Sequence, residues 1–138
     1  MSKVAIVFWS QTGNTETMAN CIAEGAGVNA TIIPCSEMNA AKLGEYDVVA
    51  FGCPAMGAEQ LEESEFEPMF SDLEGSLNGK KVAMFGSYGW GDGEWMRGWE
   101  KDCDDSGIRL VCESVTCCEA PDDAALDACR ALGKELAK

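Results

Sequence analysis

Hydrophobic residues near the start of the chain change from one periodicity to another. Residues 4–9 form an unbroken apolar run with several β-branched side chains, which is typical of a strand buried on both faces of a parallel sheet. From Asn14 onward, apolar positions recur at helical spacing, at Met18, at Cys21 or Ile22, and at Ala26. The pattern therefore predicts a strand, a tight loop and a helix in close succession.

The loop between this strand and this helix, residues 10–15, carries hydroxyl and amide side chains around a single glycine. The free N–H groups of a helix start point outward at such a place and attract an anion, so we interpret the loop as a phosphate cradle. No Lys or Arg lies between Lys3 and Lys42, and the loop lacks the Gly-x-x-x-x-Gly-Lys-Ser/Thr pattern of a P-loop. The simpler interpretation is that these side chains only cap the helix, although one helix needs one cap and this loop offers several.

The rest of the chain continues to alternate between strand and helix patterns. Further strands are predicted at 29–34, 47–53, 80–86 and 108–118, the last interrupted around Glu113 and Ser114. A polar link containing Lys42 and Glu45 joins the second strand to the third. The apolar faces of three more helices are expected at Phe66, Met69, Phe70 and Leu73, at Trp95, Met96, Trp99 and Cys103, and at Ala125, Cys129, Leu132 and Leu136.

Five strands alternating with four helices predict an α/β fold, a doubly wound parallel sheet with helices on both faces. No repeat or flexible linker interrupts the pattern, so residues 1–138 are expected to form a single domain. Ligands of such sheets bind outside the carboxyl ends of the strands. Three chemically unusual loops, 10–15, 53–59 and 87–93, leave strands at that edge, and we expect them to meet.

Charge and composition narrow the possible partners and compartments. The 138 residues include 24 acids and 10 bases, a net charge of −14, which disfavours nucleic acid and anionic membranes and favours proteins with basic patches. No apolar run approaches the roughly 20 residues that span a bilayer, and the start of the chain reads as a strand, not a signal peptide. We therefore expect a cytoplasmic protein.

The eight cysteines do not have the spacing of a metal site. There is no Cys-x-x-Cys, and the ferredoxin-like spacing that begins at Cys112 and Cys117 fails at Ala120. Histidine is absent, which removes the commonest metal ligand and general base. We expect no metal and interpret most of these cysteines as small apolar residues that fill the core.

Three sequence motifs, at the ends of three predicted strands, together resemble those of the flavodoxins. The similarity covers nearly the whole chain. Residues 10–15, Ser-Gln-Thr-Gly-Asn-Thr, look like the phosphate loop of that family. Residues 55–57, Ala-Met-Gly, resemble its flavin-contacting loop, and residues 86–91, Gly-Ser-Tyr-Gly-Trp-Gly, match its aromatic loop. Together with residues 61–68, the likeness is to short-chain flavodoxins of anaerobic bacteria, which implies a flavodoxin-like sheet of strand order 2-1-3-4-5.

The resemblance implies FMN, bound without a covalent bond, and assigns residues to its phosphate and ribityl chain. The phosphate would be held by the side chains of Ser10, Thr12, Asn14 and Thr15. Gln11 and Gly13 would supply backbone N–H groups to the same phosphate. Ser87 and the backbone near Pro54 would line the ribityl chain.

The resemblance also assigns residues to the flavin ring. Met56 would lie on its inner face and Trp90 on its outer face. Glu59 would form a hydrogen bond with the pyrimidine edge of the flavin. Backbone N–H groups near Gly89 and Gly91 would also approach that edge. The remaining members of the implied cofactor site are Ala55, Gly57, Ala58 and Tyr88.

The implied function is that of a one-electron carrier and not of an enzyme. The protein would be a monomer that shuttles electrons between larger redox enzymes. An uncharged pocket near the acids Glu59, Glu62 and Glu63 opposes added negative charge, which favours a low potential. Reductases and low-potential acceptors with basic patches are the expected partners.

Other protein classes that share this layout fit the sequence less well. A receiver domain would need clustered acids where this chain has Trp9 and Ser10, and a Cys-x5-Arg phosphatase would need Arg where it has Glu59. An FMN-binding module that reduces a small substrate directly remains the alternative.

Overall fold

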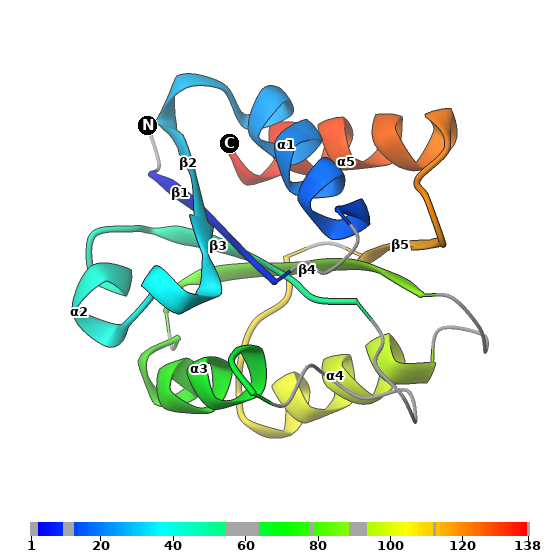
Figure 1. Cartoon of the computed structure of the whole chain (residues 1–138). Helices are drawn as coiled ribbons and strands as arrows, with labels where there is room; N and C mark the ends of the chain where they lie inside the picture. The colour runs from blue at the N-terminus through cyan, green and yellow to red at the C-terminus, as the bar shows by residue number, and fades with distance from the viewer. Residues whose placement is uncertain are drawn as a thin grey trace.

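A parallel sheet of five strands occupies the centre of the molecule (Figure 1). The computed structural model describes residues 3–9, 13–54, 64–77, 79–88, 94–111 and 113–137. The strand order is β2-β1-β3-β4-β5 and every neighbouring pair is parallel, which confirms the predicted doubly wound sheet. The strands are β1 Val4–Phe8, β2 Ala30–Pro34, β3 Val48–Gly52, β4 Lys81–Tyr88 and β5 Val115–Cys118.

Helices cover both faces of this sheet, as a parallel sheet with buried strands requires. Figure 1 shows α1 and α5 together on one face and α3 and α4 on the other. The helices are α1 Asn14–Ala26, α2 Ala40–Leu43, α3 Phe66–Leu73, α4 Glu94–Asp105 and α5 Asp123–Leu136, with short 3-10 turns at Gly27–Asn29, Cys35–Glu37 and Glu74–Ser76. Among the residues described, no helix is long and apolar enough to cross a membrane.

Successive residues of the central strands point into two separate cores. All five residues of β1 and all five of β3 are buried, because a helix layer covers each face. Val4, Ile6 and Phe8 pack in the core beneath α1 and α5, whereas Ala5 and Val7 pack in the core above α3 and α4. The predicted helix faces are confirmed, because every apolar position predicted for them is buried. These positions are Met18, Cys21, Ile22 and Ala26 in α1, Phe66, Met69, Phe70 and Leu73 in α3, Trp95, Met96, Trp99 and Cys103 in α4, and Ala125, Cys129, Leu132 and Leu136 in α5.

The structure differs from the sequence prediction at the end of β4. Ser87 and Tyr88, expected in a loop after residue 86, continue the strand and pair with Cys117 and Cys118 of β5. Pairing with a neighbouring strand thus overrides the turn-like Gly-Ser-Tyr-Gly composition of this stretch. Strand β4 therefore extends two residues further than the sequence predicted, to Tyr88.

Two connections also differ from the prediction. Residues 108–111 were expected to be strand, but they form only an isolated bridge, Val82 with Leu110, before the interruption that was predicted at Glu113 and Ser114. The Ser114 hydroxyl donates to the Glu100 carboxylate of α4 at 2.8 Å, which anchors this break. The link between β2 and β3, predicted only as polar, contains α2, whose N-cap Asn39 accepts a hydrogen bond from the Lys42 N–H at 2.8 Å.

Two glycines allow the backbones of α1 and α5 to touch. A Cβ atom added at Gly133 of α5 would overlap the carbonyl oxygen of Ile22, and one added at Gly25 of α1 would overlap that of Arg130. The helices therefore pack more closely than helices that carry side chains at the crossing. This contact joins the first helix of the chain to the last.

The substitution Gly133→Ala tests the importance of this contact. Alanine favours a helix by about 1 kcal/mol over glycine, but the overlap with Ile22 should reverse the sign and destabilise the fold by roughly 1 to 3 kcal/mol. Urea-induced unfolding measures the change. The control is Gly98→Ala in α4, where an added Cβ meets nothing within 4 Å and should stabilise the protein. Equal stabilisation by both substitutions would contradict the close helix contact.

Candidate functional site

The carboxyl ends of β1, β3 and β4 lie next to one another at one edge of the sheet. Phe8 is in register with Gly52, and Gly52 is in register with Phe85. Beyond the strands, the Trp9 N–H donates to the Gly52 carbonyl at 3.0 Å, and the Cys53 N–H donates to that of Phe85 at 3.2 Å. The three unusual loops of the sequence therefore leave three adjacent strands, on both sides of the point where the strand order reverses.

The amino end of α1 opens onto this edge, and no side chain among the described residues caps it. Its N-cap residue is Gly13, with a left-handed backbone at φ 94°. Both the N–H and the hydroxyl of Thr17 donate to the Gly13 carbonyl oxygen at 2.9 Å. Asn14 lies within the first turn of the helix and not at the N-cap. The start of α1 therefore presents the positive end of its dipole at this edge, and no described side chain caps the helix.

Thr15 is the most unusual residue of this turn. It is 1% exposed, and its hydroxyl oxygen has no hydrogen-bond partner within the part of the chain that the structure describes. A buried hydroxyl without a partner costs about 1 to 3 kcal/mol. Its place in the first turn of α1 makes it a fitting donor for an anion bound at the helix start.

Two tryptophan side chains form hydrogen bonds that connect the strand ends to the starts of neighbouring helices. The indole N–H of Trp95, in the first turn of α4, donates to the Cys53 carbonyl at 3.2 Å, and its ring lies 5.4 Å from that of Tyr88. The half-buried Trp9 donates its indole N–H to a Glu65 carboxylate oxygen at 3.3 Å, just before α3. Sequence reasoning assigned Trp95 to a helix face and Trp9 to a strand, and it missed both hydrogen bonds because their partners lie more than 40 residues away.

Six of the predicted cofactor residues fall in the described part of the chain. Near the start of α1 are Gly13, Asn14 and Thr15, and at the ends of β3 and β4 are Pro54, Ser87 and Tyr88. Ser87 is buried, at 4% exposure, and Tyr88 is half-buried. The other predicted residues lie outside the described residues; they are Ser10, Gln11, Thr12, Ala55, Met56, Gly57, Ala58, Glu59, Gly89, Trp90 and Gly91.

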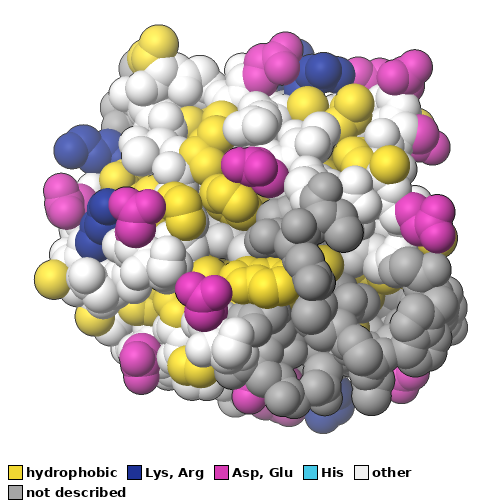
Figure 2. Space-filling model, in the orientation of Figure 1, with side chains coloured by type: hydrophobic (Ala, Val, Ile, Leu, Met, Phe, Trp, Pro, Cys, Tyr) yellow, Lys and Arg dark blue, Asp and Glu magenta, His cyan; other side chains and the backbone are white. Residues whose placement is uncertain are grey.

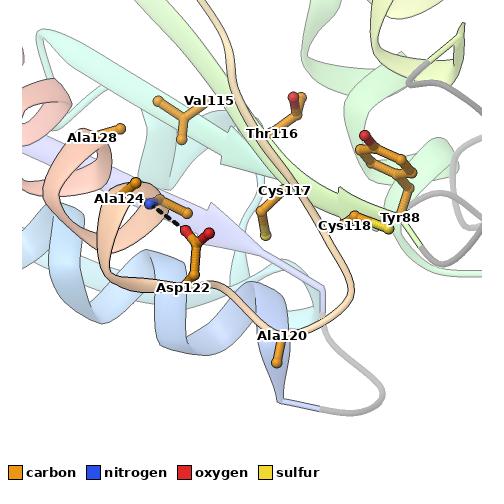
Figure 3. Close-up of a pocket in the computed structure, with 10 residues that line it drawn as sticks. Tyr88, Val115, Thr116, Cys117, Cys118, Ala120, Asp122, Ala124 and Ala128 are labelled. Atoms are coloured by element: carbon orange, nitrogen blue, oxygen red, sulfur yellow. Dashed lines mark hydrogen bonds between the residues drawn. The ribbon is translucent and has the colours of Figure 1, made fainter.

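A cavity of about 440 Å³ lies beside Tyr88, between β5 and the start of α5 (Figure 3). Cys117 and Cys118 of β5 both line it. The Asp122 carboxylate also faces the cavity, but it already caps α5 by accepting the Ala125 N–H at 2.8 Å. Apart from Tyr88, Thr116 and Asp122, the side chains that line the cavity are small apolar groups and thiols.

Most of the described cysteines are buried in the core, as the sequence indicated. Cys21, Cys35, Cys53, Cys103 and Cys129 are buried, whereas Cys117 and Cys118 line the cavity. Burial, reinforced by nearby acids, raises the pKa of Cys103 to about 12, and burial likewise raises the pKa of Cys129 to about 12. No group of three or more metal-ligating side chains occurs among the described residues.

Comparisons with known proteins give one consistent result. The family model for flavodoxin matches residues 6–133. The chain is 45% identical to a flavodoxin of Megasphaera elsdenii over 98% of both chains, and 46% identical to one of Clostridium beijerinckii over 96% of this chain and 97% of the relative. The solution structure of two-electron reduced M. elsdenii flavodoxin superposes with a TM-score of 0.88 at 44% identity, covering 97% of this chain and 98% of that one. A flavodoxin from the domain Archaea gives a TM-score of 0.84 at 28% identity, covering 97% and 95%.

Alkylation tests the assignment of the cysteines. At pH 8, a thiol whose pKa is near 12 is ionised in roughly one molecule in ten thousand, so Cys103 and Cys129 should resist iodoacetamide while the protein is folded. Exposed Cys118 should react first. Peptide mass spectrometry identifies the modified residues, and the same reaction in urea is the control. Modification of Cys129 as fast as Cys118 in the folded protein would show that the core is more open than described.

Proposed function

The chain belongs to the flavodoxin family and is an FMN-binding electron carrier, not a catalyst, and on that premise we propose how its residues hold FMN. The proposal is that residues 1–138 form a single domain with FMN at the carboxyl edge of β1, β3 and β4. Doubly wound sheets generally bind ligands at this edge, but flavodoxin-type sheets are themselves examples from which that rule was drawn, so the rule is not independent support. The stronger support therefore comes from individual residues of this chain.

The single observation that carries the phosphate assignment is the buried hydroxyl of Thr15. The open start of α1, with glycine at its N-cap, supplies N–H groups and a positive dipole end, and the Thr15 hydroxyl lacks a partner among the described residues. A terminal phosphate would satisfy all of these donors at once. The donor set therefore fits FMN, with Ser10, Gln11, Thr12, Gly13 and Asn14 proposed as the remaining phosphate contacts.

The ends of β3 and β4 are proposed to hold the rest of the cofactor. Buried Ser87 and the backbone at Pro54 fit the ribityl chain, because they lie at adjacent strand ends of the same sheet edge. For the flavin ring, the residues proposed are Ala55, Met56, Gly57, Ala58, Glu59, Tyr88, Gly89, Trp90 and Gly91. When bound, FMN supplies reversible one-electron exchange, and the chain's task is to orient it and set its potential.

A low reduction potential is part of the proposal. The described residues at the ends of β1, β3 and β4 and in the first turn of α1, which include Trp9, Thr15, Pro54 and Ser87, carry no cationic side chain to stabilise added negative charge. A carboxylate about 10 Å away, at an effective dielectric constant near 40, opposes such a charge by roughly 0.8 kcal/mol before screening. With 24 acids against 10 bases in the chain, these contributions favour electron donation.

The alternative of direct reduction of a small substrate is not favoured. The two bacterial relatives are flavodoxins that this chain covers over 97% or more of their length, so neither contains an additional domain that this chain lacks. Substrate turnover would need a pocket built over the flavin. Electron transfer to other proteins needs only an accessible cofactor edge.

The partners are proposed to be redox proteins with basic patches, which this chain meets as a monomer. Figure 2 shows acidic side chains spread over one face of the molecule, with few basic ones between them. Opposite charge on a partner would steer the encounter. The cytosol is the proposed compartment, in keeping with the absence of disulfide bonds among the seven described cysteines, because reducing conditions there preserve thiols.

Replacing Thr15 by valine tests the phosphate site. Loss of a charge-assisted hydrogen bond should weaken FMN binding by roughly 1 to 3 kcal/mol, while riboflavin, which lacks the phosphate, should bind almost as before. The apoprotein should not lose stability, because the substitution removes a buried hydroxyl that has no partner among the described residues. Fluorescence titration with both flavins measures the difference, and Thr15→Ser, which keeps a hydroxyl, is the control. Equal loss for FMN and riboflavin would place the phosphate elsewhere.

Salt dependence tests the proposed partner chemistry. Electron transfer from the reduced protein to an acceptor with a basic patch should slow steadily as salt rises, because screening removes electrostatic steering. Stopped-flow measurements with cytochrome c as the basic probe give the rate at each ionic strength, and a small neutral quinone acceptor is the control. Rates with the basic protein that stay flat between about 10 and 500 mM salt would contradict docking by charge.

A further inference from the structure

Trp95 lies where the ends of β3 and β4 meet the start of α4. Its side chain is 3% exposed, and its indole N–H donates to the Cys53 carbonyl, the last one before Pro54. The same ring lies 5.4 Å from the ring of Tyr88, at an interplanar angle of 52°. One indole therefore contacts both strand ends from which the proposed flavin loops depart.

Gly86 shows how tightly these groups are packed. A Cβ atom at this position of β4 would overlap the Cys53 carbonyl oxygen and would come within 3.1 Å of Cζ2 of Trp95. The end of β3, the end of β4 and the indole are thus in mutual contact, with no room for a further methyl group. A shift of any one of them would be transmitted to the other two.

The hydrogen bond from Trp95 fixes the direction in which the chain leaves β3. The Cys53 N–H still bonds to the Phe85 carbonyl across the sheet, but the next residue is Pro54, which has no N–H to continue the ladder. The indole N–H of Trp95 donates a hydrogen bond to the Cys53 carbonyl at this point. On the other strand, the Tyr88 carbonyl accepts the Glu119 N–H at 2.6 Å, and Glu119 adopts the uncommon left-handed backbone, φ 59°.

We propose that Trp95 is a positioning residue for the flavin, which holds the ends of β3 and β4 at the separation and orientation that the cofactor requires. This inference rests on the proposed function, since it assumes that the loops after Pro54 and Tyr88 contact FMN. Trp95 itself need not touch the cofactor. It acts through the Cys53 carbonyl and the Tyr88 ring.

Trp99 provides a matched comparison on the same helix. It lies one turn further along α4, is also 3% exposed, and packs against the rings of Phe66 and Phe70 at 5.5 Å. Its indole nitrogen has no hydrogen-bond partner in the described part of the chain. Trp99 thus shares the size, burial and helix of Trp95 but does not bond to a strand end.

The test compares Trp95→Phe with Trp99→Phe in the full chain. Both substitutions should lower the stability of the apoprotein, because both leave space in the core. Only Trp95→Phe should raise the FMN dissociation constant, by roughly tenfold or more, and change the visible circular dichroism of bound FMN and its midpoint potentials. Trp99→Phe should leave the dissociation constant within about twofold of the parent value.

A second variant and a second measurement keep the test decisive. Gly86→Ala strains the same contact from the β4 side, so it should weaken FMN binding, and its effect should not add to that of Trp95→Phe. If Trp95→Phe does not fold, the parent protein labelled with ¹⁵N in its indoles should show a shift and slower hydrogen exchange of the Trp95 N–H on adding FMN, with Trp99 unchanged.

Two results would overturn the proposal. One is an equal effect of Trp95→Phe and Trp99→Phe on FMN affinity and spectra. The other is a Trp95 indole signal that does not respond to FMN. Failure of the unmodified protein to bind FMN would instead overturn the proposed function and, with it, this inference.

Discussion

Parallel pairing of β1 with β3 is the constraint on which the rest of the molecule depends. Every residue of both strands is buried, so the pair forms only when helices cover both faces. Because the register pairs Phe8 with Gly52, β1 and β3 end at the same level of the sheet. Phe85 of β4 is paired with Gly52 at that level. A packing requirement in the middle of the sheet thereby determines where polar groups meet at its edge.

The two buried polar groups without partners, in the part of the chain that is described, have different physical meanings. Thr15 lies at the open start of a helix, beside donors that also favour an anion, so a ligand can satisfy it. The Trp99 nitrogen is buried on α4, where the indole ring has edge-to-face contacts with Phe66 and Phe70 of α3. Those aromatic contacts compensate part of the cost of burial. Burial alone therefore does not identify a binding residue, and the surrounding electrostatics must be considered.

Most of the fold could be predicted from the sequence because its signals are local. The apolar run of β1 and the helical spacing of α3 and α4 follow from the faces that those residues must bury. The extent of β4 could not be predicted, because Ser87 and Tyr88 are strand only through pairing with β5. Residues 108–111 have a strand-like composition, yet they meet β4 at a single bridge before Ser114 turns to Glu100. In the site, Thr15 was predicted from the loop pattern, whereas the bond from Trp95 to Cys53 depends on a contact across 42 residues that no local pattern contains.

The contact between α1 and α5 has a consequence for the order in which the protein is built. The apolar face of α1, which includes Met18 and Ile22, shares its core with Cys129, Leu132 and Leu136 near the other end of the chain. During synthesis, α1 therefore stays without its packing partner until α5 has left the ribosome, because the two helices are separated by about the whole length of the sheet-forming sequence. The residues at the start of α1 can reach their final positions only after that event. Binding of FMN at the start of α1 is thus expected to follow the packing of α5 against α1.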